Sequence, residues 1–250
     1  MTNKPMPTSD DALLAKLSDA NLERYARHLV LPKIGPAGQQ RLLSSRVAIV
    51  GIGGIGCPVA QSLVAAGVGH LTLIDDDRIA LSNLNRQILF SETEIGTLKV
   101  EAAARALAHL NPQSSYAIVA QKITDQNAQK LLANHDLIID GTDTYGSRCV
   151  ISAATHRLGQ ALISASVLGV EGQVAIFAQS PKRQYTDLFP ITTNGQETCA
   201  EVGVFSSATS MVASVAACVA ITGIVKGSFD GFDGQCALVN CWPPSIYWLS

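Results

Sequence analysis

Charged and aromatic residues are scarce in this sequence. Of its 250 residues, 15% are charged and 5% are aromatic, whereas 47% are hydrophobic. Disordered chains combine low hydrophobicity with high charge, so this composition excludes a disordered protein. Basic and acidic residues number 18 and 20, and a formal net charge of −2 lacks the basic surplus of proteins that bind a phosphate backbone. We therefore expect a globular protein with no nucleic-acid partner.

The N-terminal segment lacks the apolar stretch of a signal peptide. Residues 1–11 are mostly polar and contain prolines at positions 5 and 7. We expect a polar tail over residues 1–18, followed by a single domain over residues 19–250, located in the cytoplasm.

Closely spaced cysteine pairs are missing. The nearest two of the six cysteines, Cys236 and Cys241, have four residues between them, whereas a zinc site usually takes its first ligands from a Cys-x-x-Cys turn. We expect dispersed, mostly buried thiols and no bound zinc.

One segment, residues 202–225, lacks charge altogether and is long enough to span a bilayer. Six serines and threonines interrupt it, and no flanking Lys or Arg cluster orients it. We expect a core helix or a subunit interface, with no membrane partner.

Predicted strands and helices alternate along most of the chain. This order is typical of an α/β protein with a doubly wound, Rossmann-like, mostly parallel sheet. A helix over residues 22–29 forms an N-terminal extension, and an antiparallel part lies toward the C-terminus. A mobile loop is expected near residues 179–198, which are rich in Pro, Thr, Gln and Gly. The predicted strands cover residues 46–50, 71–74, 116–120, 137–139, 161–166 and 173–177, and the predicted helices extend to residue 66 and over residues 100–107, 125–134 and 145–158.

A glycine motif directly follows the first predicted strand. Gly51–Gly56 has the pattern Gly-x-Gly-x-x-Gly, which lets the backbone turn tightly and approach a phosphate at a helix N-terminus. Asp75 ends the second strand, where a carboxylate can accept hydrogen bonds from ribose hydroxyls. The motif indicates an adenine nucleotide and leaves open whether it is a dinucleotide or ATP.

Charged and amide residues after Asp75 favour chemistry at phosphates. If residues 83–87 are helical, Asn83, Arg86 and Gln87 share one face, and Lys99 opens the next helix. Cations at a nucleotide-binding rim suit phosphoryl or nucleotidyl transfer, because negative charge builds on the phosphates. Asp143, at the end of the fourth strand, could hold Mg²⁺ against them.

These motifs together resemble the ThiF/MoeB/HesA family, the bacterial relatives of ubiquitin-activating enzymes. The likeness covers roughly residues 20–226 and keeps the family's order of motifs, which is far more specific than the glycine pattern alone. The segments that carry it are residues 24–28, 31–32, 51–56, 75–77, 82–87, 96–100, 110–112, 140–143, 172–174 and 199–204.

The resemblance implies an activity. The C-terminal glycine carboxylate of a small ubiquitin-like sulfur-carrier protein that ends in Gly-Gly would attack the α-phosphate of ATP, giving an acyl-adenylate and pyrophosphate. Arg27 would reach the nucleotide of a second subunit, which implies a homodimer. Carried over by position, the catalytic residues are Arg27, Arg86, Lys99 and Asp143, the last of which also binds Mg²⁺. The nucleotide-binding residues are Gly51, Gly53, Gly54, Gly56, Asp75, Asp77, Asn83, Arg86, Gln87, Lys99 and Asp143.

The sequence departs from the family pattern at three places. Residues 184–187 stand where the family commonly has Cys-x-x-Cys, and a second such pair is missing near residue 250. Thr144 replaces the usual asparagine after the Asp-Gly-Thr-Asp motif. Cys199 aligns with a loop cysteine that forms a covalent intermediate in some members, and it could be such a nucleophile or an unreactive residue.

Other functions remain open at this point. An NAD-dependent oxidoreductase would also use the glycine motif with Asp75, and a non-catalytic nucleotide-binding member would fit the lost cysteines. A relative that acts on a tRNA base or a peptide is a further alternative. The sequence does not say whether the carrier belongs to molybdopterin or thiamine biosynthesis, and the length predicts that sulfur arrives from a separate protein.

Overall fold

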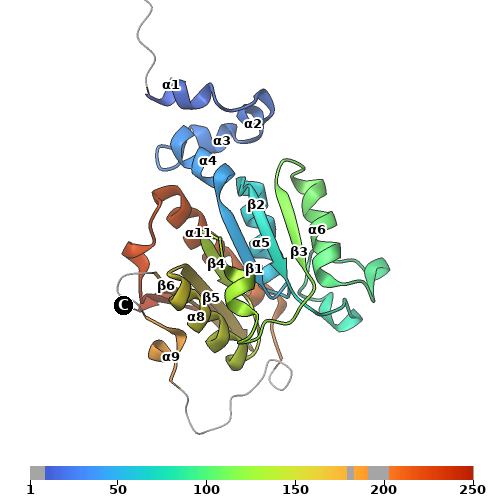
Figure 1. Cartoon of the computed structure of the whole chain (residues 1–250). Coiled ribbons are helices and arrows are strands. Elements are labelled where there is room, and N and C mark those ends of the chain that lie inside the picture. Colours follow the sequence, from blue (N-terminus) through green and yellow to red (C-terminus); the bar gives the residue numbers. More distant parts are fainter. Residues whose placement is uncertain (1–8, 179–182, 191–202, 250) are drawn as a thin grey trace, which may run out of the picture.

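A single sheet organises the protein (Figure 1). The structure, a computed structural model, describes residues 9–178, 183–190 and 203–249. Within them, eight strands pair in the order β3-β2-β1-β4-β5-β6-β7-β8. The first five in sequence are parallel, and β5 to β8 pair antiparallel, so the predicted fold class is confirmed. The strands are β1 (Arg46–Val50), β2 (His70–Ile74), β3 (Ser115–Val119), β4 (Leu137–Asp140), β5 (Ala161–Leu168), β6 (Glu171–Phe177), β7 (Cys236–Cys241) and β8 (Pro244–Leu249).

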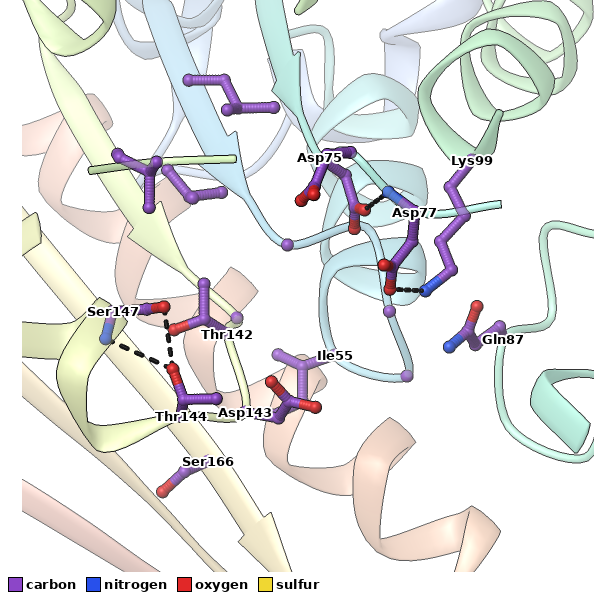
Figure 2. Close-up of a pocket in the computed structure, with 18 of the residues that line it drawn as sticks. Ile55, Asp75, Asp77, Gln87, Lys99, Thr142, Asp143, Thr144, Ser147 and Ser166 are labelled. Carbon is purple, nitrogen blue, oxygen red and sulfur yellow. Dashed lines mark hydrogen bonds and ion pairs between the residues drawn. The ribbon is translucent and has the colours of Figure 1, made fainter. Parts of the chain in front are cut away.

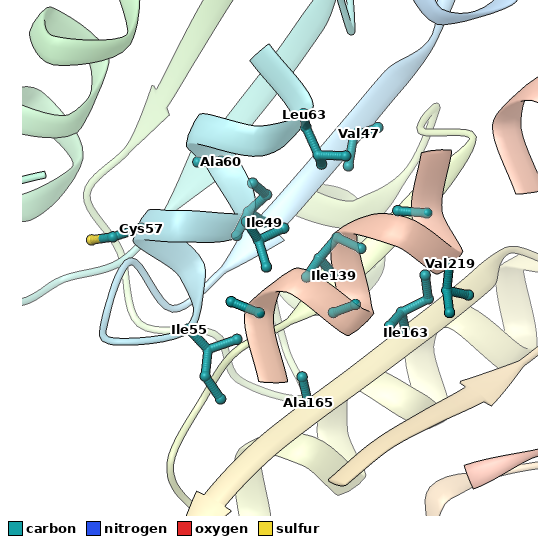
Figure 3. Packing of buried hydrophobic residues seen from close by; sticks show 14 of the residues in the cluster. Val47, Ile49, Ile55, Cys57, Ala60, Leu63, Ile139, Ile163, Ala165 and Val219 are labelled. Carbon is teal, nitrogen blue, oxygen red and sulfur yellow. The ribbon is translucent and has the colours of Figure 1, made fainter. Parts of the chain in front are cut away.

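Helices cover both faces of the central strands, because those strands are apolar on both sides. In β1, Val47 and Ile49 enter one core cluster, whereas Ala48 and Val50 enter the other. Figure 3 shows the first cluster, in which side chains of the sheet meet those of two helices. The helices on that face are α5 (Gly56–Ala66), α6 (Lys99–Leu110) and α11 (Ser206–Lys226), and those on the other face are α7 (Ala128–Leu132), α8 (Tyr145–Leu158) and α9 (Tyr185–Leu188).

The strand order creates a crevice at the carboxyl end of β1. This strand pairs with β2 on one side and with β4 on the other. The helices that follow β1 and β4, α5 and α8, lie on opposite faces of the sheet. Open α/β sheets bind ligands at such a switch point. The glycine motif, which follows β1 directly, is therefore placed at the crevice by the topology.

Helix α11 is part of the core. It is the one helix among the described residues that is long and apolar enough to cross a membrane, but 61% of its most apolar window is buried inside the protein. It packs on α4 (Gly35–Ser44), on α5 and on strands β5 to β7. The prediction of a core helix is confirmed.

Local structure differs from the prediction in the N-terminal extension. The predicted helix over residues 22–29 is divided into α2 (Asp19–Arg24) and α3 (Ala26–Leu29). The break occurs at Tyr25, whose ring is buried and whose hydroxyl accepts a hydrogen bond from Asn111. A further helix, α1 (Ser9–Leu14), lies within the segment that we expected to be a tail.

Two other regions also differ. Helix α7 is shorter than predicted, because Asn127 caps the turn that precedes it and Asn134 takes a positive φ of 64° soon after it. The predicted loop near residues 179–198 contains α9 within residues 183–190, and its residues 179–182 and 191–198, like Cys199, lie outside the described residues.

Gly69 offers a test of this packing. A Cβ atom at Gly69 would lie 1.8 Å from the carbonyl oxygen of Leu43, a backbone atom that cannot rotate away. We expect Gly69→Ala to lower the free energy of unfolding by about 1–3 kcal/mol. Gly146→Ala is the control, because nothing lies within 4 Å of its Cβ position. Urea unfolding of both variants measures the difference, and equal stability would contradict the close packing at residue 69.

Candidate nucleotide-binding site

Most of the predicted site residues line one cavity of about 340 Å³ at the carboxyl edge of the parallel strands (Figure 2). This volume lies in the range of small-molecule sites. Figure 2 shows Asp75, Asp77 and Lys99 on one side and Asp143 with Thr144 on the other. The predicted residues that line it are Gly51, Gly53, Gly54, Asp75, Asp77, Asn83, Arg86, Gln87, Lys99 and Asp143.

The glycines have different roles in the loop between β1 and α5. Gly51 has a φ of +86°, and a Cβ at Gly56 would lie 2.0 Å from the Gly51 carbonyl oxygen. Gly56 is buried and does not line the cavity, so its role is to allow this close approach. Gly53 faces open space, since the nearest atom to a Cβ there is Gln87 Nε2 at 3.7 Å. A phosphate could approach the backbone at Gly53.

Asp75 holds the loop in place. Its Oδ2 atom accepts a hydrogen bond from the Ile52 amide at 2.7 Å, and its Oδ1 atom accepts one from the Asp77 amide at 2.8 Å. Burial raises the pKa of this carboxyl, while the charge of Lys99 and the two amides oppose the rise. The carboxylate lines the cavity with both oxygens already oriented, as a ribose-binding group requires.

Lys99 brings a buried positive charge to the cavity. Its ammonium group donates to Asp77 Oδ2 at 2.7 Å, and its side chain is only 6% exposed, whereas that of Asp77 is 66% exposed. The two residues also share a backbone bond, from the Lys99 amide to the Asp77 carbonyl at 3.0 Å. The ion pair keeps Lys99 oriented without a ligand.

Residues 83–87 do not form the helix that we considered. The 3₁₀ turn Leu81–Asn83 is followed by hydrogen-bonded turns in which the Arg86 and Gln87 amides both bond to the Asn83 carbonyl. Asn83, Arg86 and Gln87 nevertheless all line the cavity. Gln87 is 3% exposed, and its Oε1 atom is buried without a partner among the described residues.

A buried hydrogen-bond network that sequence reasoning missed supports the cavity-lining residue Thr142. Asp140 is fully buried and accepts hydrogen bonds from the Thr142 amide and hydroxyl and from the Ser164 hydroxyl. Burial raises the pKa of Asp140, and the charge of Arg148 opposes the rise. Arg148 lines the cavity and donates to the Thr142 carbonyl at 2.8 Å. An arginine five residues after the Asp-Gly-Thr-Asp motif was the available signal.

Asp143 and Thr144 lie at the rim opposite Lys99. Asp143 is exposed, and its carboxylate makes no hydrogen bond with other described residues. Thr144 is the N-cap of α8, since its hydroxyl oxygen accepts from the Ser147 amide at 3.3 Å. Although Thr144 replaces the family's usual asparagine, residue 144 therefore still has a side chain that can cap a helix.

The donor set fits Mg²⁺ at this rim. Magnesium prefers carboxylate, phosphate and water oxygens, and Asp143 offers an uncommitted carboxylate beside the glycine loop. Oxygen atoms of Asp75, Asp76 and Asp77 also lie within 4.8 Å of one another, but Asp75 and Asp77 already accept hydrogen bonds.

Of the described cysteines, Cys236 and Cys241 enter different core clusters, so these two thiols do not share a metal site.

Arg27 lies far from this cavity. It is exposed on α3, and the N-terminal helices lie at the amino edge of the sheet (Figure 1). It does not line the cavity, which opens at the carboxyl edge. Within one chain, Arg27 and the other predicted catalytic residues are at opposite edges.

Comparison with known proteins agrees with these features. Residues 25–242 match the model of the ThiF family. The chain belongs to the ThiF family. It is 36% identical over 207 residues to the "Sulfur carrier protein adenylyltransferase" of Thermus thermophilus, covering 80% of this chain and 76% of that protein. It is 37% identical over 226 residues to the "Adenylyltransferase and sulfurtransferase MOCS3" of Drosophila sechellia, covering 90% of this chain and 50% of that protein. The chain thus spans about half the length of such MOCS3 relatives.

Solved structures share the fold of this ThiF family member. E. coli MccB with MccA-N7isoASN has a TM-score of 0.81 and 22% sequence identity, over 94% of this chain and 72% of that one. SeMet PaaA has a TM-score of 0.78 and 22% identity, over 94% and 74%. At this identity the likeness shows a common fold.

The buried carboxyl Asp140 leads to a pH prediction. Because its pKa is raised in the folded protein, its protonation stabilises the fold fully below the pKa of the unfolded chain, and this contribution is lost as the pH rises through the folded pKa. Above the folded pKa of Asp140 the protein bears the cost of a buried charge. Asp140→Asn removes the charge; its Oδ1 atom can still accept from Thr142, and its Nδ2 atom can donate to the Ser164 hydroxyl oxygen. We therefore expect the Tm to rise by a few degrees at pH values above that pKa.

The gain should shrink as the pH falls toward the raised pKa of Asp140. Thermal unfolding of the ligand-free protein between pH 8 and pH 5 measures it, and Asp143→Asn, at an exposed carboxylate, is the matched control. A lower Tm for Asp140→Asn at every pH would contradict the prediction.

Proposed function

We propose that this protein uses ATP to adenylylate the C-terminal glycine of a small ubiquitin-like sulfur-carrier protein of the molybdopterin or thiamine type. The observation that supports it most is the convergence of Arg86 and Lys99 with the glycine loop and Asp143 in one cavity. The names of the relatives in Thermus and Drosophila describe adenylyltransferases, one of them acting on a sulfur carrier.

The reaction needs positioning and charge neutralisation more than proton transfer. A carboxylate oxygen of the carrier attacks the α-phosphorus of ATP, and the bond from that phosphorus to the bridging oxygen of the pyrophosphate group breaks. The terminal carboxylate is already ionised near neutral pH, so no general base is required. Negative charge moves onto the leaving pyrophosphate, and donors fixed in advance stabilise it.

The residues of the cavity divide these tasks. Asp75 would accept the ribose hydroxyls, and the backbone at Gly53 would contact the phosphates. Lys99 and Arg86 would neutralise the triphosphate, with Asn83 and Gln87 beside them; the unpartnered Oε1 of buried Gln87 could accept a bond from the nucleotide or from water. Asp143 would hold Mg²⁺, which when bound lowers the repulsion between the phosphates and the incoming carboxylate.

The family assignment favours this function over an NAD-dependent oxidoreductase. A nucleotide-binding member without catalytic activity would have the same cavity, and turnover distinguishes it. The carrier's pathway, covalent chemistry at Cys199, the cytoplasmic location and the absence of nucleic-acid, membrane or zinc binding stay predictions.

Removing the Arg86 guanidinium tests the proposal. Among the described residues, Arg86 donates to the Ser82 carbonyl and the Asn85 side chain, both on exposed residues, so the fold should not depend on it. We expect Arg86→Ala to lower ATP–pyrophosphate exchange about 100-fold or more, since a preorganised donor at the phosphates is lost. The assay contains Mg-ATP, labelled pyrophosphate and the candidate carriers ending in Gly-Gly from the same genome.

Arg105→Ala is the matched control. Arg105, on α6, is an exposed arginine that pairs with the half-buried Glu94 outside the cavity, so its loss should change exchange less than about twofold. Exchange that is absent in the unmodified protein with every carrier, while Mg-ATP still binds, would support the non-catalytic alternative.

A homodimer is the second part of the proposal. Arg27 is exposed at the edge of the sheet opposite its own cavity, and it makes no hydrogen bond or ion pair with the described part of the chain, so it can serve this site only from a second copy. We propose that the two subunits exchange this arginine.

Complementation between two inactive variants tests the exchange. Arg27→Ala and Lys99→Ala should each be inactive alone, but a mixed dimer contains one site with an intact Lys99 and an intact Arg27 from its partner. Coexpression of equal amounts should restore about a quarter of the activity, since half of the dimers are mixed and each has one working site. No recovery in mixed dimers purified by two different tags would exclude the arrangement.

A further inference from the structure

Helix α9 is anchored by aromatic rings. Tyr185, at its start, is 3% exposed, and its ring centroid lies 4.6 Å from that of Phe189, 5.7 Å from that of Tyr145 and 6.3 Å from that of Phe177. We call these four residues the aromatic cluster. They come from α9, from the first turn of α8 and from the end of β6. Such ring pairs add to the stabilisation from burial alone.

Two hydrogen bonds fasten the same helix to α8. The Tyr145 hydroxyl donates to the Phe189 carbonyl at 2.8 Å, and the Tyr185 amide donates to the Ser152 hydroxyl oxygen at 2.8 Å. Both ends of the four-residue α9 are therefore tied to α8. A helix this short does not hold its own conformation, so its position depends on these contacts.

The aromatic cluster adjoins the nucleotide cavity through α8. Tyr145 directly follows Thr144, the N-cap at the cavity rim. Arg148, one turn further along α8, lines the cavity and donates to the Thr142 carbonyl, and its Nε atom is buried without a partner among the described residues. Tyr145 and Ser152, which both contact Tyr185, lie three residues before and four residues after Arg148 on α8, so Arg148 shares the face of α8 that α9 covers. The Arg148 guanidinium also opposes the rise that burial causes in the pKa of Tyr185.

We propose that the aromatic cluster is a brace for the nucleotide site, in which Tyr185 orients the Arg148 guanidinium and Arg148 holds the loop 142–144 that carries Asp143. Tyr185 and Arg148 are positioning residues in this arrangement. An arginine has many rotamers, and packing that restricts them before the ligand binds reduces the conformational entropy lost on binding. The proposal rests on the proposed function in one respect, that the positioned ligand is Mg-ATP.

The brace predicts a coupled loss of nucleotide affinity. We expect Tyr185→Ala and Arg148→Ala each to weaken Mg-ATP binding about tenfold, and the double variant to be no weaker than either single one, because both remove the same support. Tyr185→Phe keeps the ring packing and should recover most of the affinity. Isothermal titration with Mg-ATP measures all four variants.

A structural role alone would give a different result. Phe229→Ala is the control, because Phe229 packs directly on Gly223 of α11, away from the nucleotide cavity. It should lower the Tm as Tyr185→Ala does, but leave Mg-ATP affinity within about twofold. Affinity that falls equally in both variants, or losses that add in the double variant, would overturn the brace.

Hydrogen exchange keeps the test independent of the proposed function. In the ligand-free protein, a peptide covering residues 140–147 should exchange faster in Tyr185→Ala than in Phe229→Ala, because the loop is released locally. Unchanged exchange would overturn the brace even if nucleotide binds. Failure of the unmodified protein to bind Mg-ATP would instead contradict the proposed function. If Tyr185→Ala does not fold, Tyr145→Phe keeps the ring and removes the bond to the Phe189 carbonyl. It should show the same faster exchange in smaller degree, and unchanged exchange in this variant would overturn the proposal.

Discussion

The hydrogen bond from the Ile52 amide to the Asp75 carboxylate joins the glycine loop after β1 to the end of β2, and the geometry of the cavity depends on it. Both strands are rigid because each is paired on both sides within the sheet. The loop between β1 and α5 has no such pairing, so this bond fixes it at its start. The close approach of Gly51 and Gly56 then sets the turn into α5. In the proposed function the same carboxylate would also bind the ribose, so one residue would both shape the site and bind the nucleotide.

Most of the fold and the site could be predicted from sequence because both depend on local patterns. Apolar runs that end at Asp75 and Asp140, and a glycine motif after the first strand, specify where parallel strands end. Since those ends meet at one edge of the sheet, residues from Gly51 to Asp143 were predicted to converge, and they line one cavity. The order of these motifs along the chain was sufficient to predict that they converge, because few strand orders are possible for a doubly wound sheet.

The unpredicted features arise from contacts between distant residues. Asp140 and Arg148 act through burial and through the Ser164 and Thr142 partners, and no spacing rule indicates which buried carboxylate is hydrogen-bonded. The division of the N-terminal helix at Tyr25 depends on Asn111, 86 residues away. The turn at Asn83 replaces a helix because its side chain accepts from the Ala80 amide, a local competitor of helical hydrogen bonding that periodicity does not show.

The two partners of the Lys99–Asp77 ion pair differ in exposure. The Lys99 side chain is 6% exposed, whereas that of Asp77 is 66% exposed. Water can solvate Asp77 once the pair separates, but Lys99 loses most of its hydration wherever it turns and requires an anion beside it. In the proposed function, a phosphate group of the nucleotide would supply that anion. Lys99 would then exchange one anion for another, while water solvates the released Asp77 carboxylate. The exposed aspartate thus keeps the buried Lys99 side chain oriented at the cavity before a nucleotide binds.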